Sequence, residues 1–174
     1  MQNILVVYSS RTGNTKKVAE AICTAAPERC VLKEVKEVET LEPYKLIVAG
    51  YWVDKGGPNE DMKNFLPQLN GKTIALFQTL GADPKGEHGF GGMINAGKYL
   101  SPETKILGGL SIRGAIDPKL IAAMSKFPEG HIHAPSAEAK ARWTAASTHP
   151  DAADLEEAKS FMLKLLNMLD KFYK

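Results

Sequence analysis

The chain has no hydrophobic run long enough to cross a membrane. Its longest apolar stretches are residues 4–8 and 47–53, whereas a transmembrane helix needs about 20 apolar residues. The sequence also lacks a basic and then apolar leader at its start. A net charge of +2 without a block of basic residues disfavours nucleic-acid binding. We therefore expect a cytoplasmic protein that binds neither membranes nor nucleic acids.

Residues that bind metals or carry redox chemistry are scarce as well. The two cysteines, Cys23 and Cys30, are seven residues apart, which matches neither a Cys-x-x-Cys redox motif nor a zinc site. We therefore expect two buried structural thiols. His131 and His133 form a His-x-His pair. Because no cysteine is near it and its surroundings are loop-like, we expect no metal site there.

A hydroxyl-rich turn follows the first apolar run. It contains neither the Gly-Lys-Ser/Thr of a Walker loop nor the Gly-x-Gly-x-x-Gly of a dinucleotide fold, so a nucleoside triphosphate and NAD are poor fits. Its polar side chains and the unpaired amides of the following helix can point at one anion, which the helix dipole also favours. The turn is therefore predicted to bind a phosphate, although such residues can also simply cap a helix. Its members are Ser9, Ser10, Arg11, Thr12, Gly13, Asn14 and Thr15.

Apolar runs and amphipathic stretches alternate along the chain, which is typical of a parallel sheet covered by helices. Strands are expected at residues 3–8, 31–35, 45–51, 72–78 and 105–112. The second strand is polar enough to be an edge strand. Helices are expected at residues 14–24 and 60–66, in a short stretch ending near 100, at 136–146 with a Ser136 cap, and from Pro150 onward. A glycine-rich connection is expected at residues 80–92. We expect one domain over residues 1–174, with a less regular segment at 117–150.

The first strand, turn and helix resemble the fingerprint of the flavodoxin family. The matching positions are Val6, Tyr8, Ser10, Gly13, Thr15, Ala19 and Ile22. The resemblance implies an α/β fold with three layers, a doubly wound parallel sheet of five strands in the order 2-1-3-4-5. It also implies that the turn at residues 9–15 binds the 5′-phosphate of FMN. Flavodoxin is a standard example of the rule that ligands bind beyond the carboxyl ends of such strands.

In flavodoxins three loops hold FMN, and the resemblance assigns two more here, at residues 51–57 and 79–90. Trp52 is the best candidate to stack on the isoalloxazine ring, although it and Tyr51 can instead pack in the core. Backbone groups of the third loop are expected to bond the pyrimidine edge, with His88 or Phe90 over the other face. The expected residues of these two loops are Tyr51, Trp52, Val53, Asp54, Gly56, Thr79, Leu80, Gly81, Ala82, His88 and Phe90.

The sequence departs from the flavodoxin pattern after Trp52, where Val53 replaces a glycine whose peptide flips in many flavodoxins. We predict an FMN-binding, low-potential electron carrier that has no catalytic residues and serves a redox partner protein. Two alternatives remain: an FMN-dependent oxidoreductase taking hydride from NAD(P)H for a quinone or another small acceptor, and a flavin-free binding module. The isoelectric point near 8.4 differs from that of the acidic flavodoxins and suggests a different partner.

Overall fold

A computed structural model describes residues 3–128, 130–131 and 134–172. Five parallel strands form one sheet in the order β2-β1-β3-β5-β6, which confirms the predicted doubly wound sheet. The strands are β1 (Ile4–Tyr8), β2 (Cys30–Glu34), β3 (Leu46–Asp54), β5 (Thr73–Leu80) and β6 (Lys105–Arg113). The polar β2 lies at an edge, as expected.

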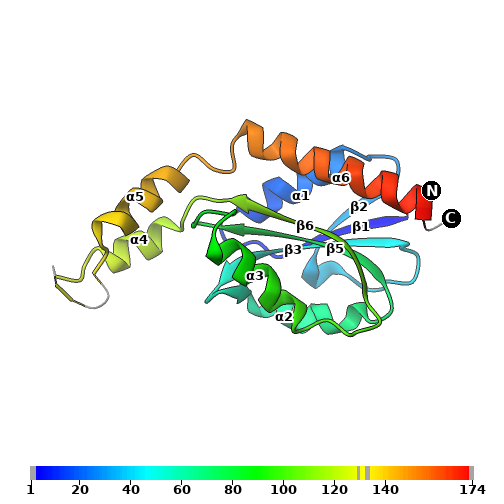
Figure 1. The fold of residues 1–174 in the computed structure, drawn as a ribbon, viewed down its shortest axis with the longest axis horizontal. Coiled ribbons are helices and arrows are strands. Elements are labelled where there is room, and N and C mark those ends of the chain that lie inside the picture. Colours follow the sequence, from blue (N-terminus) through cyan, green and yellow to red (C-terminus); the bar gives the residue numbers. More distant parts are fainter. Residues whose placement is uncertain (1–2, 129, 132–133, 173–174) are drawn as a thin grey trace.

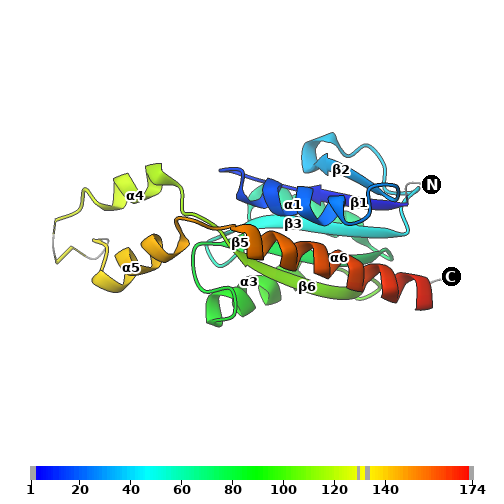
Figure 2. The same cartoon turned by 90° about the horizontal axis from the view of Figure 1, so that it is seen from above.

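Helices cover both faces of the sheet (Figures 1 and 2). On one face α1 (Asn14–Thr24) and α6 (Ala152–Phe172) pack side by side, and their apolar side chains share a core with β1, β3, β5 and β6. On the other face lie α2 (Glu60–Phe65), a 3-10 turn (Leu66–Leu69) and α3 (Glu87–Gly97), over a second core. A 3-10 turn at Val35–Glu37 follows β2. The three-layer architecture is therefore confirmed.

The segment after Trp52 is a hairpin and not the loop that the sequence suggests. Strand β3 continues to Asp54 and pairs in antiparallel fashion with β4 (Gly57–Pro58). The two turn residues, Lys55 and Gly56, have φ angles of 49° and 79°, and positive φ at both central positions is the mark of a type I′ turn. The twist of that turn matches the twist of the paired strands. The polar stretch is therefore a rigid continuation of the sheet.

The other boundary errors lie in the second half of the chain. Helix α3 begins at Glu87, within the connection that we expected to reach residue 92. Ser136 caps α5 (Ala137–Ala146) by accepting a hydrogen bond from the amide of Ala139 at 3.1 Å, as predicted. Pro150 is not the first helical residue, because α6 begins at Ala152. Asp151 caps that helix instead, accepting hydrogen bonds from Ala153 and Asp154.

Helices α4 (Pro118–Met124) and α5 form an arm, defined here as residues 117–128, 130–131 and 134–146. The arm extends past the carboxyl ends of the strands, away from the sheet and its covering helices (Figures 1 and 2). Asp117 caps α4 by accepting a hydrogen bond from the amide of Lys119 at 2.8 Å. The segment expected to be less regular therefore contains two helices, of which α5 was predicted and α4 was not.

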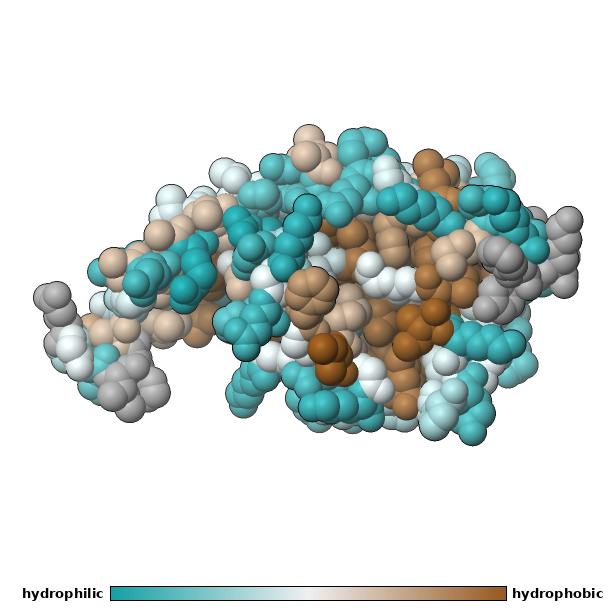
Figure 3. All heavy atoms as spheres, viewed as in Figure 1, coloured by the Kyte–Doolittle hydropathy of each residue, from teal (hydrophilic) through white to brown (hydrophobic). Residues whose placement is uncertain are grey.

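The free edge of β6 carries exposed apolar residues. Figure 3 shows apolar surface between α6 and α3 on this side of the molecule. Ile106 of β6 and Phe90 and Ile94 of α3 are all more than half exposed.

Within the described part of the chain, no helix is both long and apolar enough to cross a membrane.

Cys23 and Cys30 form a disulfide bond between the end of α1 and the start of β2. The expectation of two free thiols is therefore wrong. The spacing of seven residues gave no sign of the bond, because only the chain reversal between the helix and the strand brings the two Cα atoms to 5.6 Å. The bond closes a short loop beside the first core.

We predict that replacing Cys23 and Cys30 together by alanine lowers the free energy of unfolding by about 2 to 3 kcal/mol. The reason is that the bond restricts the unfolded chain, and even short closed loops have effects of this size. Urea unfolding followed by circular dichroism measures the change. A reductant should destabilise the wild type by a similar amount and leave the double variant unaffected. The prediction would be contradicted if the reductant left the free energy of unfolding of the wild type unchanged.

Candidate functional site

A cleft of about 500 Å³ lies where the carboxyl ends of the strands meet the arm. Its volume is within the usual range for small-molecule sites. Four parts of the chain line it: the turn after β1, the end of β3, the connection after β5, and the connection after β6 together with the arm. The lining residues are Arg11, Thr12, Asn14, Thr15, Trp52, Val53, Thr79, Leu80, Gly81, Ala82, Asp83, Gly86, His88, Gly114, Ala115, Ile116, Asp117, Leu120, Arg142 and Trp143.

The turn after β1 presents helix amides to the cleft. Gly13, with a φ of 93°, precedes the first residue of α1 and has the left-handed conformation that favours glycine. The amides of Asn14, Thr15 and Lys16 open the helix, and first-turn amides have no carbonyl partner within it. These amides and the helix dipole together favour an anion at this end of the cleft.

The hydroxyl of Thr15 is hydrogen bonded to that of Thr79 at the end of β5, with 2.8 Å between the two oxygens. Both residues are buried. In such a pair one hydroxyl donates and the other keeps its own proton for a further acceptor. When Thr79 donates, Thr15 retains a proton for a ligand oxygen. The pair therefore fixes the first helical turn to the sheet and leaves one donor available.

Three of the expected phosphate ligands do not line the cleft: Ser9, Ser10 and Gly13. The hydroxyl of Ser10 accepts a hydrogen bond from the Gly13 amide at 3.1 Å. Ser9 is buried, and its hydroxyl accepts a hydrogen bond from Asn59 at 2.8 Å and donates to Asp61 at 3.5 Å. These groups shape the turn from inside, so Thr12, Thr15 and Arg11 are the side chains of the turn best placed to contact an anion.

Trp52 lines the cleft, and the guanidinium carbon of Arg11 lies 5.6 Å from the centroid of its ring. That distance is within the range of a cation–π interaction. Val53 also lines the cleft, but Asp54 and Gly56 belong to the hairpin and do not. Tyr51 points to the other side of the strand.

Tyr51 is fully buried in the second core, and its hydroxyl donates a hydrogen bond to the carbonyl of Gly92 at 3.3 Å. Burial raises the pKa of its phenol. Tyr51 faces the core and Trp52 faces the cleft because consecutive side chains point to opposite sides of a strand.

The end of β5, the connection after it and the start of α3 together contribute Thr79, Leu80, Gly81, Ala82 and His88 to the cleft. A Cβ atom on Gly81 would lie 2.3 Å from a side-chain carbon of Ile116. Only glycine lets this backbone approach the segment after β6 so closely. Phe90 does not line the cleft, because it lies on α3 and is 65% exposed.

The residues that the sequence reasoning missed come mainly from the connection after β6 and from the arm. They are Asp83, Gly86, Gly114, Ala115, Ile116, Asp117, Leu120, Arg142 and Trp143. A signal for the first part existed, since the carboxyl ends of all parallel strands meet at one edge of a sheet, including that of β6. No comparable signal identified Trp143, whose place depends on how the arm returns to the cleft.

Contacts join the arm to the turn after β1, at residues 9–15. Arg11 forms an ion pair with Asp117 at 2.9 Å, and the side-chain amide of Asn14 donates to the carbonyl of Ala115 at 2.8 Å. The amide of Ala115 in turn donates to the carbonyl of His149 at 2.8 Å, where the chain leaves the arm. Both ends of the arm are thereby held beside the turn.

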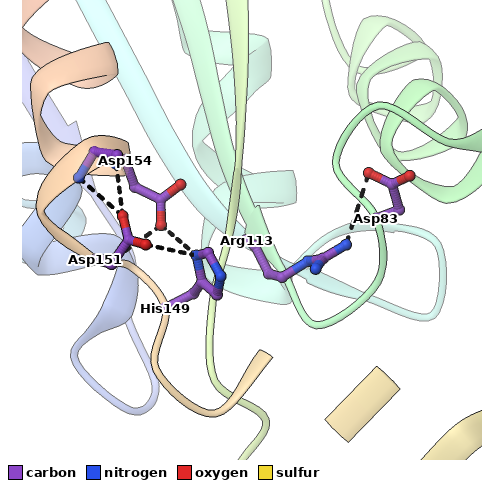
Figure 4. A network of polar contacts seen from close by, with 6 residues as sticks. Asp83, Arg113, His149, Asp151 and Asp154 are labelled. Carbon is purple, nitrogen blue, oxygen red and sulfur yellow. Dashed lines mark hydrogen bonds and ion pairs between the residues drawn. The ribbon is translucent and has the colours of Figure 1, made fainter. Parts of the chain in front are cut away.

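A polar cluster lies beyond this junction (Figure 4). The Nδ1 atom of His149 is 2.5 Å from a carboxylate oxygen of Asp154 and 3.9 Å from one of Asp151. A hydrogen bond from the backbone of Asp154 lowers the pKa of the Asp151 carboxyl. Asp151 accepts hydrogen bonds from the amides of Ala153 and Asp154 in the first turn of α6, and Asp154 accepts one from the amide of Asp151. The cluster therefore acts as a helix cap. Of the His131–His133 pair, His133 lies outside the described residues.

Comparisons with known proteins agree with this fold. A model of the flavodoxin domain matches residues 5–163. A flavodoxin-like domain-containing protein BilS of Clostridioides difficile (strain CD3) is 32% identical over 169 residues, covering 93% of this chain and 95% of the relative. A second BilS, from Clostridium symbiosum (strain WAL-14163), is 26% identical over 178 residues, covering 91% of this chain and 93% of its own.

Solved structures are similar in fold. The oxidised flavodoxin 2 of Bacillus cereus gives a TM-score of 0.61 at 19% identity, covering 95% of this chain and 99% of the other. A flavoprotein of Lactobacillus acidophilus NCFM in complex with FMN gives 0.53 at 19% identity, covering 72% of this chain and 100% of the other. With a family model that spans nearly the whole sheet and a relative aligned over almost its full length, this chain belongs to the flavodoxin domain family.

Proposed function

We propose that this protein binds FMN and carries electrons at low potential to a partner protein in the cytoplasm. The observation that carries the proposal is one cleft that two features line together. The N-terminus of α1, which favours an anion, follows β1, and the aromatic ring of Trp52 lies at the end of the neighbouring strand β3. An anionic group and a flat ring in one ligand fit that pair of features.

FMN suits the cleft better than FAD does. The chain has one phosphate-type turn and no glycine-rich pyrophosphate motif, and a flavoprotein of the same fold was solved with FMN. The turn would hold the phosphate through the helix amides, Thr12, Thr15 and Arg11. Backbone groups of residues 79–82 would meet the polar edge of the ring, and Trp52 its face. When bound, FMN supplies the one-electron and two-electron chemistry.

The polar groups of the cleft support a carrier and not a catalyst. Asp117 is paired with Arg11 at 2.9 Å. Asp83 lies 3.8 Å from Arg113 (Figure 4). Both carboxylates among the described lining residues are therefore paired with arginine side chains. A carrier needs its protein only to bind and tune the flavin.

The backbone around Trp52 supports a distinctive redox behaviour. Trp52 pairs with Thr79 in the β3–β5 ladder, and Val53 pairs with Pro58 in the hairpin. From this pairing on both sides we infer that the peptide after Trp52 keeps one orientation and does not flip as in many flavodoxins. We expect the two electrons to enter at closely spaced potentials, with little long-wavelength absorbance during anaerobic photoreduction.

A second candidate, an FMN-dependent NAD(P)H:acceptor oxidoreductase, is favoured by one observation. The arm contributes Leu120, Arg142 and Trp143 to the cleft, and an enzyme needs such additional surface to position a small acceptor. The exposed position of the arm is equally suited to meeting a partner protein, so kinetics must separate the two functions.

We predict that the protein loaded with FMN is reduced slowly by NADH or NADPH alone and rapidly once a flavoprotein reductase is added. Stopped-flow absorbance at the flavin bands measures both rates. Free FMN at the same concentration is the control for transfer that needs no protein. Sustained oxidation of NAD(P)H with a quinone, at about 1 per second or faster as enzymes typically show, would replace the carrier by the oxidoreductase.

A further inference from the structure

The arm contributes a large apolar side chain, that of Trp143, to the cleft. Trp143 lies outside the three loops that the resemblance to flavodoxins assigned to FMN. Trp143 of α5 lines the same cleft as Trp52, together with Leu120 of α4. Helix α5 is rich in alanine, and Trp143 is its single aromatic residue. Trp143 is half-buried although it lies on an otherwise mostly exposed helix. Its ring is therefore turned toward the cleft and not toward solvent.

The arm is positioned by the same residues that form the phosphate-type turn. Arg11 touches both sides of the cleft, since its guanidinium lies over Trp52 and pairs with Asp117 at the start of the arm. Asn14 bonds Ala115 two residues earlier. A ligand bound at the turn would thus lie beside the contacts that hold the arm.

We propose that the arm is part of the flavin site and that Trp143 contacts the bound isoalloxazine ring. The inference rests on the proposed FMN binding and adds the residue that the loop after β5 lacks. Of the two residues expected over the other face, Phe90 of α3 is mostly exposed and does not line the cleft, and His88 lines it with only an imidazole ring. A large aromatic surface to accompany Trp52 therefore has to come from elsewhere. Besides Trp52 and the small imidazole ring of His88, Trp143 is the one aromatic residue among the described residues of the lining.

Titration of the full-length apoprotein with FMN and with riboflavin tests the inference. Trp143→Ala should weaken the binding of both ligands by about tenfold or more, because ring contacts and buried area are lost. Trp143→Phe should stay within about threefold of the wild type. The matched control is Lys140→Ala, an exposed residue one turn earlier on α5 that does not line the cleft, and it should bind both flavins like the wild type.

The ratio of the two affinities separates ring contacts from phosphate contacts. Since Trp143 is assigned to the ring, Trp143→Ala should leave the ratio of FMN to riboflavin affinity unchanged. A second readout is tryptophan fluorescence in a Trp52→Phe background, where FMN should quench the remaining emission. Circular dichroism confirms that each variant is folded, and if the Trp143→Ala protein fails to fold, the quenching measurement decides.

The outcomes distinguish this inference from the proposed function. Normal FMN binding with equal affinities in Trp143→Ala and Lys140→Ala, or no quenching of Trp143, would overturn the role of the arm and leave FMN binding intact. A wild-type protein that binds neither flavin would overturn both.

Discussion

Replacing Thr12 and Thr15 together by alanine is expected to weaken FMN binding by about a hundredfold to ten-thousandfold. Both residues line the cleft at the start of α1. A hydrogen bond to a charged group contributes about 1.5 to 3 kcal/mol, so two such bonds to a phosphate dianion give roughly 3 to 6 kcal/mol. Loss of the Thr15 hydroxyl also removes the partner of Thr79, with which it shares a 2.8 Å hydrogen bond. Isothermal titration calorimetry measures the change.

Riboflavin and a distant threonine provide the controls for this prediction. Riboflavin has no phosphate, so its affinity should change by less than about threefold in the double variant. Thr24→Ala alters the opposite end of α1, where the hydroxyl bonds the Ala21 carbonyl, and should leave FMN binding unchanged. Thr15→Ser keeps the hydroxyl and should retain most of the affinity. Equal FMN affinity in the double variant and the wild type would remove the phosphate assignment.

Gly50→Ala should destabilise the fold by about 3 kcal/mol or more. A Cβ atom on Gly50 would lie 1.8 to 2.3 Å from ring carbons of Phe77 on the neighbouring strand. Phe77 is fully buried in the first core, so its ring has no free space to move into, and overpacking of this kind costs about 1 to 3 kcal/mol or more. Urea unfolding of the variant measures the loss.

A second glycine gives the matched control for Gly50. Gly97, the last residue of α3, has no atom within 4 Å of the position that a Cβ would occupy, so Gly97→Ala should be neutral or slightly stabilising. Phe77→Leu combined with Gly50→Ala should recover part of the loss, because the smaller side chain makes room beside the new methyl group. A Gly50→Ala protein as stable as the wild type would show that the two strands separate more easily than their packing indicates.

Features that depend on neighbours in the chain were predicted well. Helix α1 spans Asn14–Thr24 as expected, and Ser136 caps α5, because caps and helical periodicity are set by residues a few positions apart. The strand order came from the resemblance to flavodoxins and is confirmed by the pairing. The hairpin after Trp52 was missed because Lys55 is an unusual residue for positive φ.

The candidate site likewise contains residues that a local pattern predicted and residues whose role depends on distant contacts. Four residues of the turn after β1, together with Trp52 and residues 79–82, were assigned from the sequence and contribute to the cleft. Ser9 was assigned too, but Asn59, fifty residues away, binds its hydroxyl. Which donors of a turn remain free depends on such distant partners, and a local pattern contains no information about them.

The sequence by itself determined the alternation of strands and helices, the hydroxyl-rich turn before α1 and the family, since each depends on residues close together along the chain. Only the tertiary structure decided that Cys23 pairs with Cys30, that Arg11 joins Trp52 to Asp117, and that Trp143 lines the cleft. The ion pair between Arg11 and Asp117, for example, connects residues that are more than one hundred positions apart. Contacts of that kind arise from packing the whole chain, because geometry and not sequence proximity selects the partners.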